Sequence, residues 1–252
     1  MKITTVFFDL GSTLVYCKDP WPPIYEQADR EMIRVLQSSG IAIDQASFVT
    51  EFGGFIQSYY QKRYENNIEP TSFAALRDLL IQKGFQHVPE TVLRKAMEAL
   101  YAVTQKNWYL EEDAIETLQS LKSRGYRLGI ISNTSDDQNV QGIVDKWGLR
   151  PYFERIVTSA ELGVRKPDPR IFQAALDHFQ VPPEKAVMVG DLLQADVLGA
   201  NQVGIYSIWI TRRAQVPEEG ELTIQPQAVV TALNQIPPLL IEVEKDSAEW
   251  LE

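Results

Sequence analysis

Short apolar runs that alternate with helix-length amphipathic segments are the feature of this sequence that most restricts its fold. The alternation extends from residue 108 to about residue 210. The predicted strands are residues 128–131, 155–157, 186–189 and 205–210, and the predicted helices are residues 113–124, 137–147, 168–179 and 195–202. Strands separated by helices form parallel sheets through right-handed crossovers. The pattern therefore predicts an α/β fold with a Rossmann-like core of three layers, in which helices cover both faces of a parallel sheet.

A further strand and a long helical segment precede this region. Residues 3–8 are mostly β-branched or aromatic and predict a buried first strand that ends at Asp9. Apolar residues then recur at helical spacing as far as residue 106. We therefore expect an all-helical cap domain, residues 17–106, inserted after the first strand into a core of residues 1–16 and 107–241. Within that core, residues 225–240 are predicted to supply a last helix, and the acidic C-terminal tail, residues 242–252, is expected to fray.

Polar side chains follow three of the predicted strands at the point where each strand ends. Asp9 follows the first strand, Ser132 and Asn133 follow the second, and Asp191 follows a later one. Lys166 lies in a loop just before a predicted helix. Because ligands of open parallel sheets bind beyond the carboxyl ends of the strands, we expect these residues to form one site.

The residue types at this predicted site suit the handling of a phosphate group. A carboxylate at a strand end before a tight turn, such as Asp9, can act as a nucleophile with backbone donors around it. Ser132 offers a hydroxyl group, and Lys166 a positive charge, to the oxygens of an anion. Asp191 and Asp196 supply carboxylates of the kind that bind Mg²⁺.

Each of these elements also has a purely structural interpretation. A single aspartate at a strand end is usually a turn or cap residue. Ser132 or Thr134 could cap the following helix, and Asp168 before Pro169 is expected simply to begin a helix. Lys166 alone would be an ordinary solvated lysine. The order of the elements and their shared position at strand ends favour the functional interpretation.

The same residues resemble the four motifs of the haloacid dehalogenase-like hydrolase superfamily, whose members are mostly phosphatases. The matching segments are residues 8–14 (FDLGSTL), 128–133 (LGIISN), 163–169 (GVRKPDP) and 189–196, which begins with Val-Gly-Asp. They occur in the order typical of the family, and the resemblance covers residues 2–240. The position of the helical insert resembles that of the C1-type cap, which closes over small substrates in this family.

The resemblance implies a mechanism and a set of ligands. It implies that Asp9 attacks phosphorus and forms an aspartyl-phosphate, which water then hydrolyses. It also implies a Mg²⁺ ion held by Asp9, the main-chain carbonyl of Gly11 and Asp191, while Asp196 either assists the metal shell or orients Lys166. The residues implied to bind the phosphoryl group of a small phosphorylated substrate are Ser12, Ser132, Asn133 and Lys166.

One position departs from the pattern of the family. Family phosphatases usually carry a second aspartate two residues after the nucleophile, which protonates the leaving group and then activates water. Gly11 stands at that position here, and Ser12 replaces the usual glycine after it. Proton transfer of this kind contributes about 10²–10⁴-fold to a rate. Sugar-1-phosphates, acyl phosphates and aryl phosphates, which have good leaving groups, are the substrates that best tolerate its loss.

Alternatives to phosphatase activity remain open. Gly11 favours a weakly active or inactive family member that binds a phosphorylated ligand or a protein. A dehalogenase, which uses no metal, is disfavoured by Asp191 and Asp196. A phosphonate hydrolase needs a Schiff-base lysine from the insert, and no lysine there stands in a recognisable context. A phosphomutase normally needs the missing second aspartate.

Composition restricts the partners and the compartment. Asp and Glu number 34 against 24 Lys and Arg, and an acidic field of this kind repels polyanions, so we expect no nucleic acid partner. No apolar run approaches the roughly 20 residues that a membrane helix needs, and the N-terminus does not resemble a signal peptide. The single cysteine, Cys17, fits a reducing compartment, so we predict a cytoplasmic protein. The sequence leaves the oligomeric state open.

Overall fold

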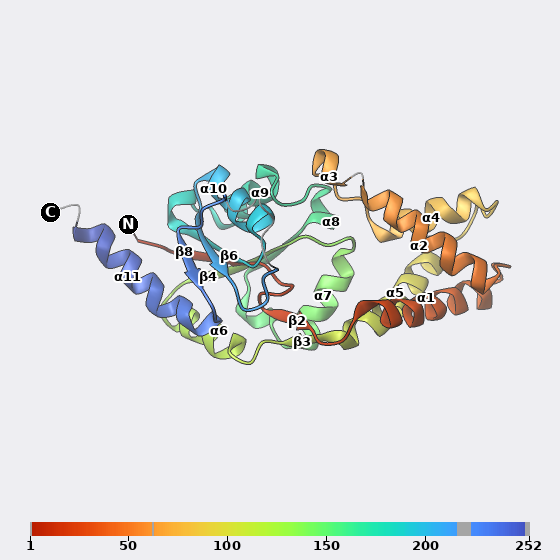
Figure 1. Cartoon of the computed structure of the whole chain (residues 1–252), viewed down its shortest axis with the longest axis horizontal. Coiled ribbons are helices and arrows are strands. Elements are labelled where there is room, and N and C mark those ends of the chain that lie inside the picture. Colours follow the sequence, from red (N-terminus) through yellow and green to blue (C-terminus); the bar gives the residue numbers. More distant parts are fainter. Residues whose placement is uncertain (1, 62, 216–222, 250–252) are drawn as a thin grey trace.

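The computed structural model describes residues 2–61, 63–215 and 223–249, and a six-stranded sheet forms its centre (Figure 1). The order of strands across the sheet is β5-β4-β1-β6-β7-β8. The strands are β1 (Thr5–Phe8), β4 (Arg127–Ser132), β5 (Arg155–Thr158), β6 (Ala186–Gly190), β7 (Tyr206–Ile210) and β8 (Ala228–Val230). All neighbouring pairs are parallel. The predicted parallel sheet is therefore confirmed, and β1 lies at its centre between β4 and β6.

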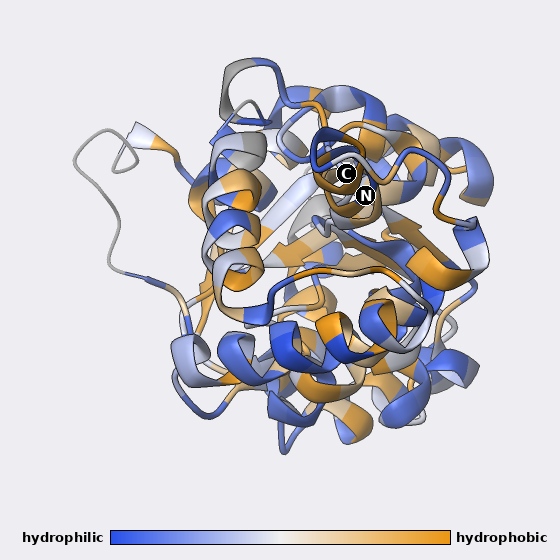
Figure 2. Ribbon diagram, turned by 90° about the vertical axis from the view of Figure 1, so that its right-hand side faces the viewer, coloured by the Kyte–Doolittle hydropathy of each residue, from blue (hydrophilic) through white to orange (hydrophobic). Residues whose placement is uncertain are grey.

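Helices cover both faces of this sheet, which confirms the predicted three layers. One face packs against α6 (Ala114–Ser123), α7 (Asp137–Lys146) and α11 (Ile236–Glu249), and the other against α9 (Pro169–Phe179) and α10 (Leu198–Val203). Val6 and Phe8 belong to the first apolar core and Phe7 to the second, because successive side chains of a strand point to opposite faces. Figure 2 shows hydrophobic residues along the strands and hydrophobic and hydrophilic residues alternating around the helices.

Within the described residues, five helices lie between β2 (Val15–Cys17) and β3 (Trp108–Leu110) and form the right-hand part of Figure 1. They are α1 (Trp21–Ser38), α2 (Gln45–Gln61), α3 (Arg63–Asn66), α4 (Ser72–Gln82) and α5 (Glu90–Thr104). This helical insert has an apolar core of its own, in which Met32, Leu76 and Met97 are buried. The strands β2 and β3 pair antiparallel and join the insert to the sheet-containing part.

The remaining elements in the described residues are short helices and turns. They are α8 (Ser159–Leu162), a π-helical turn at Leu193–Val197, and 3₁₀ turns at Gln105–Asn107, Arg150–Tyr152, Pro183–Lys185 and Leu233–Gln235. None of the helices in the described ranges is long and apolar enough to cross a membrane. The division into domains at residues 17–106 stays a prediction.

The C-terminal region differs from the prediction. Residues 225–240 do not form one helix, since β8 extends the sheet before α11 begins at Ile236. The acidic tail is helical as far as Glu249, so its fraying stays a prediction, and residues 250–252 lie outside the described residues. The Glu244 carboxylate accepts hydrogen bonds from the Ile3 backbone N–H (3.1 Å) and the Tyr126 hydroxyl (3.2 Å). These contacts with Ile3 and Tyr126 stabilise α11, and the sequence pattern of the tail does not reveal them.

Candidate active site

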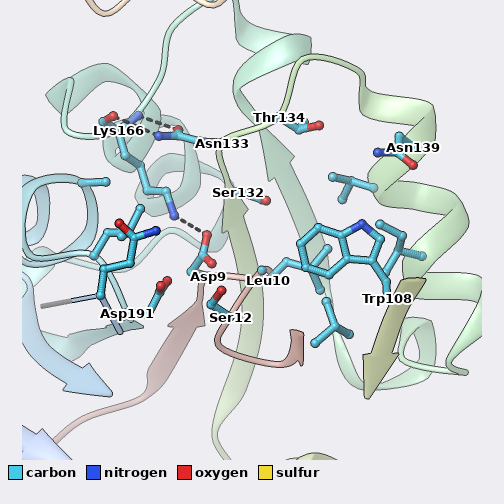
Figure 3. A pocket seen from close by; sticks show the side chains of 17 residues that line it. Asp9, Leu10, Ser12, Trp108, Ser132, Asn133, Thr134, Asn139, Lys166 and Asp191 are labelled. Carbon is cyan, nitrogen blue, oxygen red and sulfur yellow. Dashed lines mark hydrogen bonds and ion pairs between the residues drawn. The ribbon is translucent and has the colours of Figure 1, made fainter. Parts of the chain in front are cut away.

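The carboxyl ends of β1, β4 and β6 meet at one edge of the sheet, beside a cavity of about 270 Å³ (Figure 3). Because β1 lies between β4 and β6, the residues that follow these strands are neighbours in space although more than 50 positions separate them in the chain. Seven of the eight predicted site residues line this catalytic cavity: Asp9, Gly11, Ser12, Ser132, Asn133, Lys166 and Asp191. The structure therefore brings together the residues that the strand-end argument selected.

Lys166 is held at the base of the site by three acceptors. Its buried ammonium donates to Asp9 Oδ1 at 2.6 Å, to Asp196 Oδ1 at 2.6 Å and to the Ile131 carbonyl oxygen at 2.7 Å. The Asn133 side chain forms two hydrogen bonds with the Lys166 backbone. Its Oδ1 accepts from the Lys166 N–H (2.8 Å), and its Nδ2 donates to the Lys166 carbonyl oxygen (3.0 Å). The lysine thus has a fixed position, and the Asn133 amide is engaged in fixing it.

Asp196 does not line the catalytic cavity. It lies behind Lys166, where Oδ1 accepts from the lysine and Oδ2 accepts from the Leu192 backbone N–H at 3.0 Å. Gly190 makes this placement possible, because a Cβ atom there would lie 2.2 Å from Asp196 Cγ. Of the two roles that the resemblance implied for Asp196, this geometry favours the orientation of Lys166.

The carboxylates of the site carry more negative charge than Lys166 can balance. Burial raises the pKa of Asp9 to about 6, although the charge of Lys166 opposes the shift. Burial, followed by the charges of Asp9 and Asp196, raises the pKa of Asp191 to about 8. Burial alone would lower the pKa of Lys166, but the charges of Asp196 and Asp9 outweigh it and hold that pKa above its usual value. A further cation beside Asp9 and Asp191 would favour the ionised form of both carboxylates at neutral pH.

The residues at the end of β1 and β6 fit the binding of Mg²⁺. Asp9 and Asp191 are oxygen ligands whose pKa values are raised by burial. A divalent cation bound between them would stabilise their ionised forms and lower these pKa values. Within the described ranges, no three His, Cys, Asp or Glu side chains form a metal-binding group. Two carboxylates, the Gly11 carbonyl and water are nevertheless sufficient, because Mg²⁺ keeps several waters and needs only one or two carboxylates.

Trp108 occupies the space beside Gly11. A Cβ atom at Gly11 would lie 3.2 Å from Trp108 Cη2 and 3.5 Å from Trp108 Cζ3. The indole ring lines the catalytic cavity next to Leu10 and Asn139 (Figure 3). An indole ring rather than a carboxylate therefore stands over the position from which a general acid would act.

Sequence reasoning did not identify Trp108, Asn139 and Gln215, which also line the catalytic cavity. Trp108 belongs to β3, a strand of three residues that is too short to produce a recognisable alternation. Asn139 lies in the first turn of α7, and a polar residue at a helix start ordinarily suggests only solvent exposure. Only the arrangement of the folded chain selects these residues.

The helix starts near the site resolve the structural alternatives. Asp136 caps α7, since its carboxylate accepts from the Gln138 N–H at 2.9 Å. The alternative in which Ser132 or Thr134 caps this helix is therefore wrong. Asp168 caps α9 by accepting from the backbone N–H two residues later, which confirms the structural interpretation of that residue.

The helical insert contacts the core next to the catalytic cavity. The Ser72 N–H donates to the Ser135 carbonyl oxygen at 2.9 Å, and the two hydroxyl groups lie 2.7 Å apart. The buried Glu69 carboxylate accepts from the Ser159 hydroxyl at 2.9 Å, and the Glu69 N–H donates to the loop that precedes Lys166. The insert is therefore held against the same two core segments that carry site residues.

One relative of known name matches nearly the whole chain, and another matches about half of it. It is 30% identical over 249 residues to a glyceraldehyde 3-phosphate phosphatase from Pyrococcus furiosus, and the match covers 98% of this chain and 95% of that protein. It is 36% identical over 128 residues to a phosphoserine phosphatase from Thermus thermophilus, over 51% of this chain and 50% of that protein.

Solved structures show the same fold. A 2-haloacid dehalogenase from Pseudomonas syringae pv. tomato superposes with a TM-score of 0.70 at 23% identity, covering 95% of this chain and 99% of that one. A phosphatase of the same family from Thermococcus onnurineus superposes with a TM-score of 0.61 at 24% identity, covering 94% and 98%. At these identities the likeness concerns the fold alone.

Fold and site define a Rossmann-like α/β protein that gathers carboxylates and one lysine at the carboxyl ends of its parallel strands, beside a helical insert. A model of the haloacid dehalogenase-like hydrolase family matches residues 3–204. The chain belongs to this family of hydrolases.

Proposed function

We propose that the protein is a Mg²⁺-dependent phosphomonoesterase of small phosphorylated metabolites, which acts through an aspartyl-phosphate on Asp9. The observation that carries the proposal is the 2.6 Å contact of the Lys166 ammonium with Asp9, in a cavity that Ser132 and Asp191 also line. The names of the relatives, which are phosphatases, support it. We also propose a cytoplasmic location.

The reaction begins with attack by an Asp9 oxygen on phosphorus, which forms the Asp9–phosphorus bond as the bond to the ester oxygen breaks. Lys166 offsets charge on the transferring oxygens, and the Ser132 hydroxyl donates a hydrogen bond to one of them. The backbone N–H groups of the residues that follow Asp9 and Asn133 orient the phosphoryl group. Water then attacks phosphorus, which releases phosphate and restores the Asp9 carboxylate. Bound Mg²⁺ supplies charge neutralisation at Asp9 and Asp191.

Gly11 sets the range of leaving groups. No side chain at this position can protonate a departing alkoxide or take a proton from the attacking water, so the leaving group depends on solvent for its proton. Aryl phosphates, acyl phosphates and sugar-1-phosphates need the least help, and we propose that the natural substrate has a leaving group of this quality. Simple alkyl phosphates are expected to react about 10²–10⁴-fold more slowly than in an enzyme with a general acid.

A specific observation favours a second candidate function. Because Trp108 stands beside Gly11, the second candidate is a catalytically weak family member that binds a phosphorylated ligand or a protein. Such a protein would keep Lys166 and the phosphate-binding loops but would turn over even activated phosphate esters poorly.

Hydrolysis of p-nitrophenyl phosphate discriminates between the two functions, because its leaving group needs little acid catalysis. We expect turnover that requires Mg²⁺ and is lost in Asp9→Asn, while the exposed Asp145→Asn serves as a matched control and keeps full activity. Absence of metal-dependent turnover with this substrate, acetyl phosphate and a panel of sugar-1-phosphates would refute the hydrolase and leave the binding function.

A further inference from the structure

A second cavity, of about 510 Å³, lies in the helical insert and adjoins the catalytic cavity. Trp108 and Asn139 line both cavities, so the two spaces meet at these side chains. From α1 the second cavity receives Trp21, Tyr25 and Asp29. These three residues recur at every fourth position and therefore lie along one face of the helix.

An aromatic wall leads from the catalytic cavity into the second one. The rings of Trp108 and Trp21 lie with centroids 5.6 Å apart, and Trp21 stacks on Tyr25 with centroids 5.0 Å apart and planes inclined by 17°. The apolar residues of the rest of the lining include Phe52 and Ile56 of α2 and Met97 and Leu100 of α5, and polar residues of α3, α4, α5 and the sheet-containing part complete it. A flat, apolar group bound in this cavity would bury its surface against the aromatic rings and against the apolar residues of α2 and α5.

Asp29 is the carboxylate of this second cavity. It is partly buried, and among the described residues it has no hydrogen-bond or ion-pair partner, so burial is the cause of the rise of its pKa to about 6. Arg63, a cationic residue of the lining, lies 3.8 Å from the Glu69 carboxylate. A carboxylate held among apolar groups without a partner is unfavourable, and a bound cationic group would relieve this.

We propose that the second cavity binds the leaving-group portion of the substrate, and that the substrate is a phosphate monoester whose flat, largely apolar body ends in an ammonium group recognised by Asp29. This inference rests on the proposed phosphomonoesterase function and names the substrate class of that same site. The phosphate occupies the catalytic cavity, the body passes Trp108 and lies along Trp21, and the ammonium reaches Asp29. Triose-sized phosphates fill the first cavity only.

Two synthetic substrates of equal size test the role of Asp29. They are 4-(2-aminoethyl)phenyl phosphate, which ends in an ammonium group, and 4-propylphenyl phosphate, which ends in a methyl group at the same position. We expect kcat/KM to favour the ammonium compound by about tenfold or more in the wild type. In Asp29→Asn this preference disappears. A preference that is absent from the wild type, or unchanged in Asp29→Asn, overturns the assignment of Asp29.

Two neighbouring glycines of α2 test the cavity itself. Gly53 lines it and Gly54 does not, and a Cβ atom at either position meets no atom within 4 Å. We expect Gly53→Leu to lower the ratio of kcat/KM for 4-propylphenyl phosphate to that for acetyl phosphate by about tenfold, since the leucine fills the space for the body but not for the phosphate. The matched variant Gly54→Leu leaves the ratio unchanged. Equal ratios in both variants overturn the proposal.

The same assays separate failure of this inference from failure of the proposed function. Turnover of acetyl phosphate that requires Asp9, together with unchanged ratios in Asp29→Asn and Gly53→Leu, refutes the second-cavity site and leaves the phosphatase intact. Absence of turnover of all three phosphates refutes the phosphatase, and the substrate assignment falls with it.

Discussion

Restoring a carboxylate at position 11 is the sharpest test of how this site works. The Gly11 backbone does not have a positive φ, so a side chain is not excluded by backbone strain. The obstacle is Trp108, whose Cη2 atom would lie 3.2 Å from the new Cβ, before the carboxyl group is added. Gly11→Asp alone therefore forces either the carboxylate or the indole out of place. The variant Trp108→Leu removes the obstructing ring atoms and keeps an apolar side chain.

The expected gain follows from the role of a general acid and base. Relative to Trp108→Leu, the double variant Gly11→Asp/Trp108→Leu should raise kcat on glycerol 3-phosphate by about 10²–10⁴-fold, which corresponds to about 3–5 kcal/mol of transition-state stabilisation. On p-nitrophenyl phosphate, which needs little proton transfer, the rise should stay below about tenfold. Gly11→Asp alone should gain less than the double variant on the alkyl phosphate.

Steady-state kinetics with both substrates provides the measurement, and Trp108→Leu provides the reference. Trp108 receives hydrogen bonds from Lys146 and Trp147 through its main-chain oxygen, so these contacts survive the substitution. Equal gains on the alkyl and aryl phosphates would refute the account of the vacant proton-transfer role. A single variant as active as the double variant would refute the steric role of Trp108.

Three further predictions follow from burial and charge. Because burial raises the pKa of Asp29 to about 6, its ionisation destabilises the fold progressively from about pH 4 to pH 6. In urea unfolding, the free energy of unfolding of Asp29→Asn should equal that of the wild type near pH 4 and exceed it by about 1–3 kcal/mol at pH 7.5. Gly190→Ala places a Cβ 2.2 Å from Asp196 Cγ and should lower the free energy of unfolding by about 1–3 kcal/mol together with kcat, whereas Gly54→Ala, in open space, should do neither. Mg²⁺ at about 100 times its Kd should stabilise the protein by about 2.7 kcal/mol in thermal unfolding, and an equal shift in Asp191→Asn would contradict the proposed metal site.

Much of the fold and of the site could be predicted because the relevant signals are local. Strand residues such as those of β1 and β6 are apolar on both sides, and the polar residue that ends each strand follows directly in the chain. Parallel strands align their carboxyl ends, so Asp9, Ser132 and Asp191 were expected at the same edge of the sheet. The position of β1 between β4 and β6 then makes them neighbours. The C-terminal region was the failure, because the three residues of β8 are too few to outweigh the helical pattern around them.

The sequence by itself therefore determined the parallel α/β architecture, the helical insert and the identity of the residues at the strand ends. The tertiary structure alone decided what those residues do to one another: Asn133 fixes the Lys166 backbone, Asp196 lies behind the lysine, and Trp108 stands over Gly11. The physical reason is that periodicity and strand ends are properties of neighbouring residues. Contacts between residues 30 to 100 positions apart depend on how the finished layers pack, and that packing sets both the electrostatics and the steric limits of the site.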